Sequence, residues 1–181
     1  KMIADDGLNG FMLCDRTFNS VCLHEQDYED VVLALAKNDA EQNIIYQELH
    51  LDYPLNEERG IPMEVVMEGY RSAQKKAKEL YGVEIAYIGG IDRTLSSDQC
   101  LKFVQKLEKY HDMVAGIGMD CEEKGHPCIK HLDSYLEAKR QGFFLTAHAG
   151  EDGSDQNIWD ALLKLHVDRI DHAVGQRKIR N

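Results

Sequence analysis

Short apolar segments alternate with amphipathic segments along most of this 181-residue chain. Five apolar segments have the length and composition of buried strands: Ile44–Leu51, Val83–Ile91, Met113–Met119, Phe143–Ala147 and Arg169–Val174. Apolar residues recur at helical spacing in the predicted helices Asp27–Gln42, Met63–Leu80, Ser96 or Ser97 to about Tyr110, Ile129–Gln141 and Asp155–Leu165. A loop is predicted around Pro54, Asn56 and Gly60. Apolar strands that each precede a single helix are typical of a parallel sheet covered on both faces.

Two architectures fit this order of elements, an open doubly wound sheet and a (β/α)8 barrel. No complete glycine fingerprint of a nucleotide-binding fold follows a strand, and residues 116–121 hold only a fragment of one. Polar candidates instead lie at the end of each strand: Asp52, Asp92, Asp120, His148 and His172. Barrel enzymes place their chemistry at the C-terminal ends of strands. We therefore predict an α/β fold of the (β/α)8 TIM-barrel type. About five of the eight β/α units are found, so residues 1–181 are expected to form a single partial barrel domain.

Composition excludes several classes of function. The formal net charge of −11 disfavours nucleic acid and anionic membranes as partners. No apolar run approaches the roughly 20 residues that span a bilayer, and no secretory signal is visible, so the cytoplasm is the expected location. Five cysteines without a CxxC pair argue against a disulfide framework or a thiolate zinc site. The acidic charge allows a neutral or cationic small-molecule partner but does not demand one. Unpaired sheet edges are expected to favour association, including a homo-oligomer.

The segment His148-Ala149-Gly150-Glu151 follows a predicted strand. A histidine at a strand end can direct its imidazole at a metal ion, and two small residues let the chain turn so that Glu151 returns toward the same place. A carboxylate beside a metal-activated water can accept a proton and pass it to a substrate. The alternative is a structural histidine whose hydrogen bonds are satisfied locally.

The segment Arg169-Ile170-Asp171-His172 is a second candidate. Neighbours on a strand face opposite sides, so one of Asp171 and His172 is expected to face the site. If it is His172, Asp171 faces the helical layer. The alternative is a structural Asp–His pair. A third candidate, residues 118–125, carries three carboxylates just after a strand and forms either a solvated acidic loop or a lip of a substrate site.

These motifs, in this order, resemble the adenosine deaminase family of the amidohydrolase barrels. The sequence HAGE after an apolar strand, followed about twenty residues later by RIDHAV, carries the resemblance, and IIYQELHLDYP, RGIPMEVVMEGYRSA and GIGMDCEEKGHP extend it over roughly residues 18–175. The segments are most similar to the branch that deaminates free adenine. The resemblance implies zinc-dependent hydrolysis of a 6-aminopurine, adenine to hypoxanthine with release of ammonia, as a step of purine metabolism.

The resemblance also implies roles for individual residues. His148 matches a zinc ligand, Glu151 matches the glutamate that protonates the purine ring nitrogen, and His172 matches the histidine that orients the attacking hydroxide. Glu123, Gly150 and Asp120 are the implied substrate-binding residues. A carboxylate at position 123 can accept the N–H that free adenine carries where adenosine carries ribose, which favours adenine. The alternatives are an adenosine deaminase, which converts adenosine to inosine, a non-catalytic purine-binding protein derived from the fold, and an unrelated α/β domain.

The sequence also departs from the family pattern. It contains neither an HxH pair nor a late aspartate in an S-x-N-T-D-D-P-like stretch, which supply the family's other zinc ligands. His50 superficially echoes the HxH segment, but its surroundings match the second strand, so we predict no metal role for it. One family ligand does not hold zinc tightly in a site that normally has four protein groups. The chain alone is therefore expected to be inactive.

Overall fold

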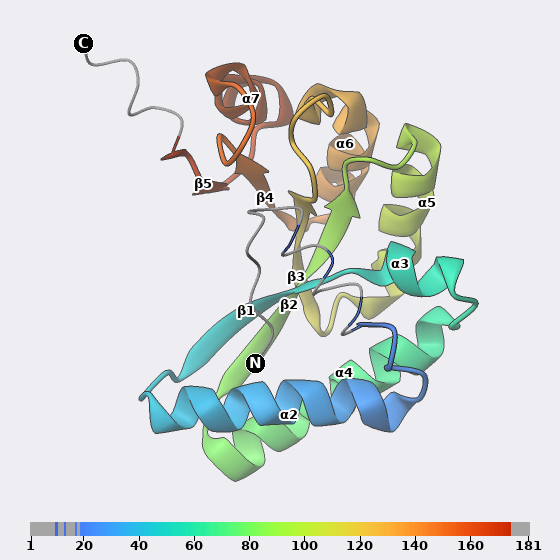
Figure 1. The fold of residues 1–181 in the computed structure, drawn as a ribbon, viewed down its shortest axis with the longest axis vertical. Helices are drawn as coiled ribbons and strands as arrows, with labels where there is room; N and C mark the ends of the chain where they lie inside the picture. The colour runs from blue at the N-terminus through green and yellow to red at the C-terminus, as the bar shows by residue number, and fades with distance from the viewer. Residues whose placement is uncertain (1–9, 11–12, 14–16, 18, 175–181) are drawn as a thin grey trace. The chain divides into compact units, whose positions relative to one another are not determined.

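The computed structural model describes residues 10, 13, 17 and 19–174. Within that part of the chain, five strands form one sheet in the order β1-β2-β3-β4-β5 (Figure 1). They are Tyr46–Leu51, Glu84–Asp92, Val114–Asp120, Phe144–Ala149 and Arg169–His172. The pairs β2·β3, β3·β4 and β4·β5 are parallel. The strand order never reverses, as it does in a doubly wound sheet. The predicted (β/α) barrel type is therefore confirmed, with five strands of a barrel described.

Helices connect the strands at the predicted places. They are α2 (Glu25–Glu41), α3 (Tyr53–Glu58), α4 (Met63–Tyr81), α5 (Ser97–Leu107), α6 (Leu132–Gln141) and α7 (Asp155–Asp160). A short 3₁₀ turn at Glu108–Tyr110 extends α5, and another at Cys128–His131 precedes α6. A π turn at Ala161–Leu165 continues α7. Ser96 caps α5 by accepting a hydrogen bond from the Gln99 backbone N–H. No helix of the described residues is long and apolar enough to cross a bilayer.

One prediction about local structure is wrong. The loop predicted around Pro54 and Asn56 is helical, since α3 covers Tyr53–Glu58. Proline fits there because the first backbone N–H groups of a helix have no intrahelical partner, so nothing is lost at Pro54. The predicted turn itself falls at Gly60, which has a left-handed φ of 75°. The residue types were therefore interpreted correctly as a turn signal, but the turn begins later than predicted.

The described residues form two compact units. The first contains the residues up to Leu49 together with Leu55–Ala86, and the second contains His50–Pro54 and the residues from Tyr87 onward. In the first unit α2 packs against α4. Gly69 permits this close approach, because a Cβ atom at that position would lie 2.4 Å from the Glu25 carbonyl oxygen. The single domain predicted for residues 1–181 stays a prediction.

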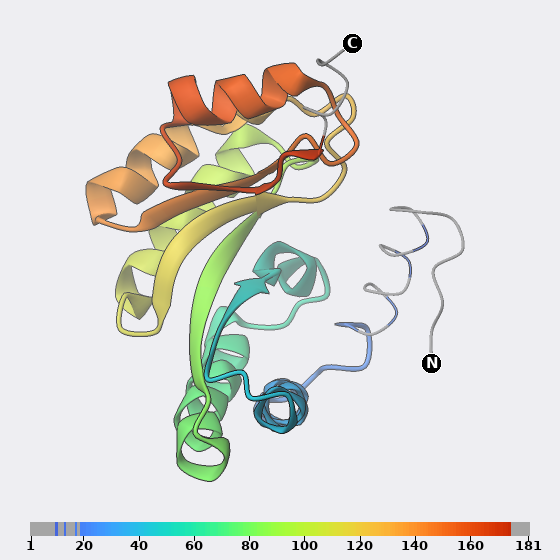
Figure 2. The same ribbon diagram turned by 90° about the vertical axis from the view of Figure 1, so that its left-hand side faces the viewer.

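The second unit holds all the candidate site residues described below. Its helices α5, α6 and α7 lie together on one side of β3 and β4 (Figure 2). Buried aliphatic side chains fill the space between helices and strands: Val104, Leu107, Ile117, Leu145 and Ile158. The apolar face of the strands is thus used for the core. The polar residues near the C-terminal ends of the strands are left for the opposite face.

Candidate active site

Strand register brings Asp171 to His148. The two residues are Cα partners in the parallel pair β4·β5, and partners in such a pair point to the same side of the sheet. Oδ2 of Asp171 lies 3.8 Å from Nε2 of His148 and 3.9 Å from Nε2 of His50. The expectation that Asp171 faces the helical layer if His172 faces the site is therefore wrong. The sequence alone does not give the register that decides which residue of β5 shares a face with His148.

His172 nevertheless reaches the same place, because the strand ends there. Its φ of 80° is left-handed, so the alternation of side chains along β5 breaks at this residue. The His172 ring centroid lies 4.7 Å from that of His148, at an interplanar angle of 80°. Its Nε2 lies 3.7 Å from Oε2 of Glu151. The structure thus brings together the three residues predicted from the HAGE and RIDHAV motifs.

His50, at the end of β1, lies beside these residues. Its ring centroid is 5.1 Å from that of His148, and its Nδ1 is 3.4 Å from Oδ2 of Asp120. Gly118 provides the room for this ring, since a Cβ atom there would lie 2.6 Å from Cε1 of His50. Asp120, predicted to bind substrate, therefore contacts His50 in this structure. The sequence signal that was missed is a histidine near a strand end, on a strand whose register was unknown.

Substituting alanine for Gly118 tests this packing. The added methyl group overlaps His50 and also comes within 2.9 Å of Cγ2 of Ile88. We expect Gly118→Ala to lower the free energy of unfolding by about 1–3 kcal/mol, because overpacking forces neighbouring side chains to shift. The measurement is urea denaturation. In a His50→Ala background the same substitution should cost less, and an unchanged cost would show that His50 does not occupy this space.

Glu123, another predicted substrate residue, lies beneath the turn that follows β4. It is buried, and its carboxylate accepts hydrogen bonds from the backbone N–H groups of the turn. The distances are 2.8 Å from Gly150, 2.9 Å from Glu151, 3.2 Å from Asp152 and 2.9 Å from Gly153. The Glu123 carboxylate thereby fixes the position of the turn that carries Glu151. The predicted contact between Glu123 and substrate stays a prediction.

The pKa of the Glu123 carboxyl is lowered by this environment. Burial opposes the charged form, but the hydrogen bonds from Gly150 and Gly153, the Asn157 side chain and the positive charge of Arg93 together outweigh it. A lowered folded-state pKa contributes stability above the unfolded-state pKa, and that stability is lost as pH falls through the folded-state pKa. The turn is therefore most firmly held at neutral pH.

Gly150 is the residue that lets this turn form. Its φ of 72° is left-handed, and a Cβ atom would lie 2.5 Å from Cδ1 of Ile158. Its carbonyl oxygen accepts a hydrogen bond from the Val174 backbone N–H, which links the turn to the residues after β5. The sequence-based expectation of a tight turn is confirmed. The predicted role of Gly150 in substrate binding stays a prediction.

Arg93 is a buried residue of the site that the sequence analysis did not identify. Its side chain is fully buried, and Nη2 donates a hydrogen bond of 2.7 Å to the His148 carbonyl oxygen. Its Nη1 lies 3.9 Å from Oε1 of Glu123. The Arg93 carbonyl in turn accepts a bond from Nε2 of the buried His131, at 3.1 Å. One guanidinium group thus connects the backbone of β4 to the carboxylate beneath the turn.

The remaining strand-end carboxylates are Asp92 and Asp52. Asp92 accepts hydrogen bonds from the backbone N–H and the hydroxyl of Thr94, at 2.8 and 2.6 Å, and so closes the turn after β2. Asp52 lies half-buried directly after β1. Position at a strand end was therefore a useful but incomplete criterion for a role in the site.

Among the residues that the structure describes, two overlapping sets of side chains could hold a metal ion. His50, His148 and Asp171 form one set, and His148, Glu151 and His172 form the other. In each set the candidate ligand atoms lie within 4.8 Å of one another. Burial and the nearby His50 and His172 rings lower the pKa of His148 to about 4, and they outweigh Asp120 and Asp171, which raise it. His148 is therefore neutral near pH 7 and offers a nitrogen lone pair, as a metal ligand requires. Imidazole and carboxylate donors fit zinc.

Comparison with known proteins shows the family of this chain. The family model described as adenosine deaminase matches residues 3–179. The chain belongs to the adenosine deaminase family. Its relatives include adenine deaminases from Chlorobium phaeobacteroides, 39% identical over 155 residues, and from Acinetobacter baylyi, 36% identical over 155 residues. Each match covers 86% of this chain, and 46% and 47% of the respective relative. The chain thus spans about half the length of the curated relatives it matches.

Solved structures also match this chain. The crystal structure of adenine deaminase from Arthrobacter aurescens has a TM-score of 0.91 and 32% identity, and the match covers 94% of this chain and 52% of that one. An amidohydrolase from Burkholderia ambifaria with bound Zn has a TM-score of 0.83 and 27% identity, covering 87% and 44%. The five strands of this chain therefore correspond to part of a family barrel.

Proposed function

We propose that this chain carries part of the active site of a zinc-dependent purine aminohydrolase that converts adenine to hypoxanthine and ammonia. The observation that carries the proposal is the proximity of His148, Glu151 and His172, whose candidate ligand atoms lie within 4.8 Å of one another. Relatives named adenine deaminase support the choice of substrate. A purine-binding protein without activity would have no need for a proton-carrying glutamate beside two histidines.

His148 is the proposed zinc ligand in this chain. Its neutral imidazole is half-buried at the end of β4, and its backbone is held by the Arg93 guanidinium. The zinc bound in the amidohydrolase from Burkholderia ambifaria supports the choice of metal. Bound zinc supplies a Lewis acid that makes water a nucleophile near neutral pH.

Glu151 and His172 are the proposed proton-handling pair. The Glu151 carboxylate accepts a proton from the attacking water and delivers it to the purine ring nitrogen beside the amino-bearing carbon. The water oxygen bonds to that carbon. The bond from the carbon to the amino group then breaks, the second proton of the former water passes to the amino group, and ammonia leaves while a carbonyl remains. His172, 3.7 Å from Glu151, donates a hydrogen bond that orients the attacking oxygen. Both side chains are partly exposed, so a small substrate can reach them.

The expected substrate preference is adenine over adenosine. The measurement is ammonia release by the complete product of the gene with each substrate, together with its zinc content. We expect kcat/KM to favour adenine by roughly 10²-fold or more, because a site that hydrogen-bonds a substrate N–H leaves buried polar groups unpaired when that N–H is missing. A higher kcat/KM for adenosine would reject adenine as the substrate. Purine binding without ammonia release would reject the enzyme proposal itself.

The 181-residue chain alone is proposed to lack deaminase activity, because family ligands other than His148 are absent from its sequence. We also propose a cytoplasmic location and association between copies through strand edges. The same ammonia assay on the purified chain tests the first point. Light scattering over a range of concentrations tests the last, and a strictly monomeric chain would contradict it.

A further inference from the structure

We infer that Glu123 is a positioning residue: its carboxylate holds the turn at residues 150–153 so that Glu151 faces His172, and it does not contact the substrate. The inference rests on the proposed function, because it takes Glu151 as the proton carrier. It gives Glu123 a role different from the substrate contact that the family resemblance implies. Turnover then depends on Glu123, whereas the choice between adenine and adenosine does not.

The Glu123 carboxylate has no accepting capacity left for a substrate. The two oxygens of a carboxylate offer about four lone pairs. The four backbone N–H groups of residues 150–153 donate to them at 2.8 to 3.2 Å, and the Asn157 side chain adds a further hydrogen bond. An N–H of adenine binds there only if it displaces one of these donors. A substrate contact would therefore loosen the turn that carries the proton carrier.

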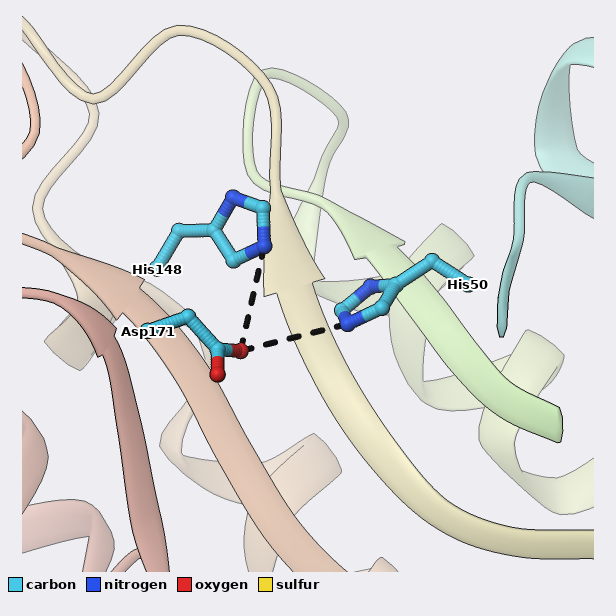
Figure 3. A group of neighbouring side chains, drawn as sticks. All are labelled: His50, His148 and Asp171. Carbon is cyan, nitrogen blue, oxygen red and sulfur yellow. Dashed lines mark ion pairs between the residues drawn. The ribbon is translucent and has the colours of Figure 1, made fainter. Parts of the chain in front are cut away.

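The Glu123 side chain is also closed to solvent, since it is only 1% exposed. Three other polar side chains point toward one another at the ends of their strands (Figure 3): His50, His148 and Asp171. They are 26%, 25% and 23% exposed. A substrate that enters the site therefore meets these accessible groups and not the Glu123 carboxylate.

The turn is built around the carboxylate. Residues 150–153 lie in neither a helix nor a strand, so regular secondary structure does not satisfy their N–H groups. A Cβ atom at Gly153 would lie 2.6 Å from Cδ of Glu123, so the backbone approaches the carboxyl group more closely than any other residue type permits. Successive N–H groups that surround an anion are typical of anion-binding loops. Here a side chain of the same chain supplies the anion.

Glu151 is tied directly into this arrangement. Its own backbone N–H donates to Oε2 of Glu123 at 2.9 Å, and the residues on both sides of it donate as well. Its side-chain Oε2 lies 3.7 Å from Nε2 of His172. A misplacement of about 1 Å can cost on the order of 10²-fold in rate. Loss of the Glu123 carboxylate therefore acts on the chemical step through Glu151.

Steady-state ammonia release by the complete product of the gene tests the inference. We expect Glu123→Gln to lower kcat per folded, zinc-loaded molecule by roughly 10²-fold. The KM for adenine and the ratio of kcat/KM between adenine and adenosine should stay the same, because an equal loss in kcat and kcat/KM marks an interaction that acts in the transition state. Glu123→Asp keeps the charge on a shorter side chain and should recover part of the lost kcat. A fall in the preference for adenine, or an unchanged kcat in Glu123→Gln, would overturn the inference.

Hydrogen exchange in the purified 181-residue chain tests the same contact without turnover. We expect Glu123→Gln to speed exchange at the amides of residues 150–153. Asp160→Asn is the matched control, because it neutralises another buried carboxylate, which accepts from Lys164 and Gln156, and it should leave those amides unaffected. Unchanged exchange in Glu123→Gln would refute the positioning role whether or not ammonia is released. Faster exchange, with no ammonia released by the unaltered gene product, would uphold the hold on the turn and reject the proposed reaction.

Gly153→Ala is a second variant for the case in which Glu123→Gln does not fold, which circular dichroism and urea denaturation establish. The added methyl group overlaps Cγ and Cδ of Glu123 and so displaces the carboxylate without removing its charge. We expect faster exchange at the amides of the turn and a loss of kcat with an unchanged preference for adenine. Normal exchange and normal turnover in Gly153→Ala would count against the inference in the same way.

Discussion

Replacing Glu151 with glutamine should lower kcat for adenine deamination by roughly 10²–10⁴-fold in the complete product of the gene, the range typical of a lost general acid–base group. Glutamine has nearly the same shape but cannot carry the proton. The turn should persist, because Glu151 is held by its backbone N–H, which donates to Glu123 at 2.9 Å. The zinc content should therefore stay the same. The measurements are steady-state ammonia release and metal analysis on the same sample.

Glu122→Gln is the control for this substitution. Glu122 is an exposed carboxylate in the neighbouring acidic loop, so the same chemical change there should leave kcat nearly unchanged. Comparable losses of kcat in both variants would mean that turnover depends on the negative charge of the whole region rather than on one proton carrier. Full turnover in Glu151→Gln would remove Glu151 from the mechanism.

The fold was largely predictable because its signal is local. Short apolar runs, separated by segments whose apolar residues recur at helical spacing, predicted all five strands to within a few residues of their observed ends. Glycine marked the ends of α4 and α6. Local signals failed where tertiary packing decides the local structure, as in the segment that was predicted to be a loop and forms α3. They also ended β4 too early, since it continues through His148 to Ala149. Its pairing with β5, which sequence does not reveal, extends the strand to these residues.

The candidate site was predictable only in part, for the same reason. His148 and Glu151 are three residues apart, so a tight turn at Gly150 is enough to bring them together. His50 and Asp171 are far apart in sequence, and their meeting with His148 depends on the register of separate strands. The burial of Arg93 could not be predicted from the sequence either, because arginine side chains are almost always exposed. Nothing in the residues around Arg93 indicates that its guanidinium lies beneath the site.

The position of Glu151 depends on two buried charges beneath it. Glu123 binds the backbone of the turn, and Arg93 binds both the β4 backbone and, more loosely, Glu123. Taking both charges out of water is costly, and their mutual attraction offsets that cost only while both are present. The turn is therefore stable while both charged side chains are present, and the loss of either one destabilises it.

Arg93→Met should consequently lower the free energy of unfolding by about 3–5 kcal/mol, the typical cost of removing one partner of a buried ion pair. Methionine fills much of the same volume, but the Glu123 carboxylate loses its positive neighbour and the His148 carbonyl loses its hydrogen-bond donor. Urea denaturation of the purified chain measures the change. The turn should also loosen, which hydrogen exchange at the amides of residues 150–153 would report as faster exchange.

Two further variants separate charge from simple packing. Arg140→Met removes an exposed arginine paired with Glu137, and it should leave the free energy of unfolding nearly unchanged, because exposed ion pairs contribute little. Adding Glu123→Gln to Arg93→Met removes the unpaired negative charge, so the double variant should be less destabilised than the sum of the two single changes, by about 0.5–3 kcal/mol. Strictly additive losses would mean that Arg93 and Glu123 act independently. Arg93 would then stabilise the chain through its contact with the His148 carbonyl, and the Glu123 carboxylate would hold the turn without its help.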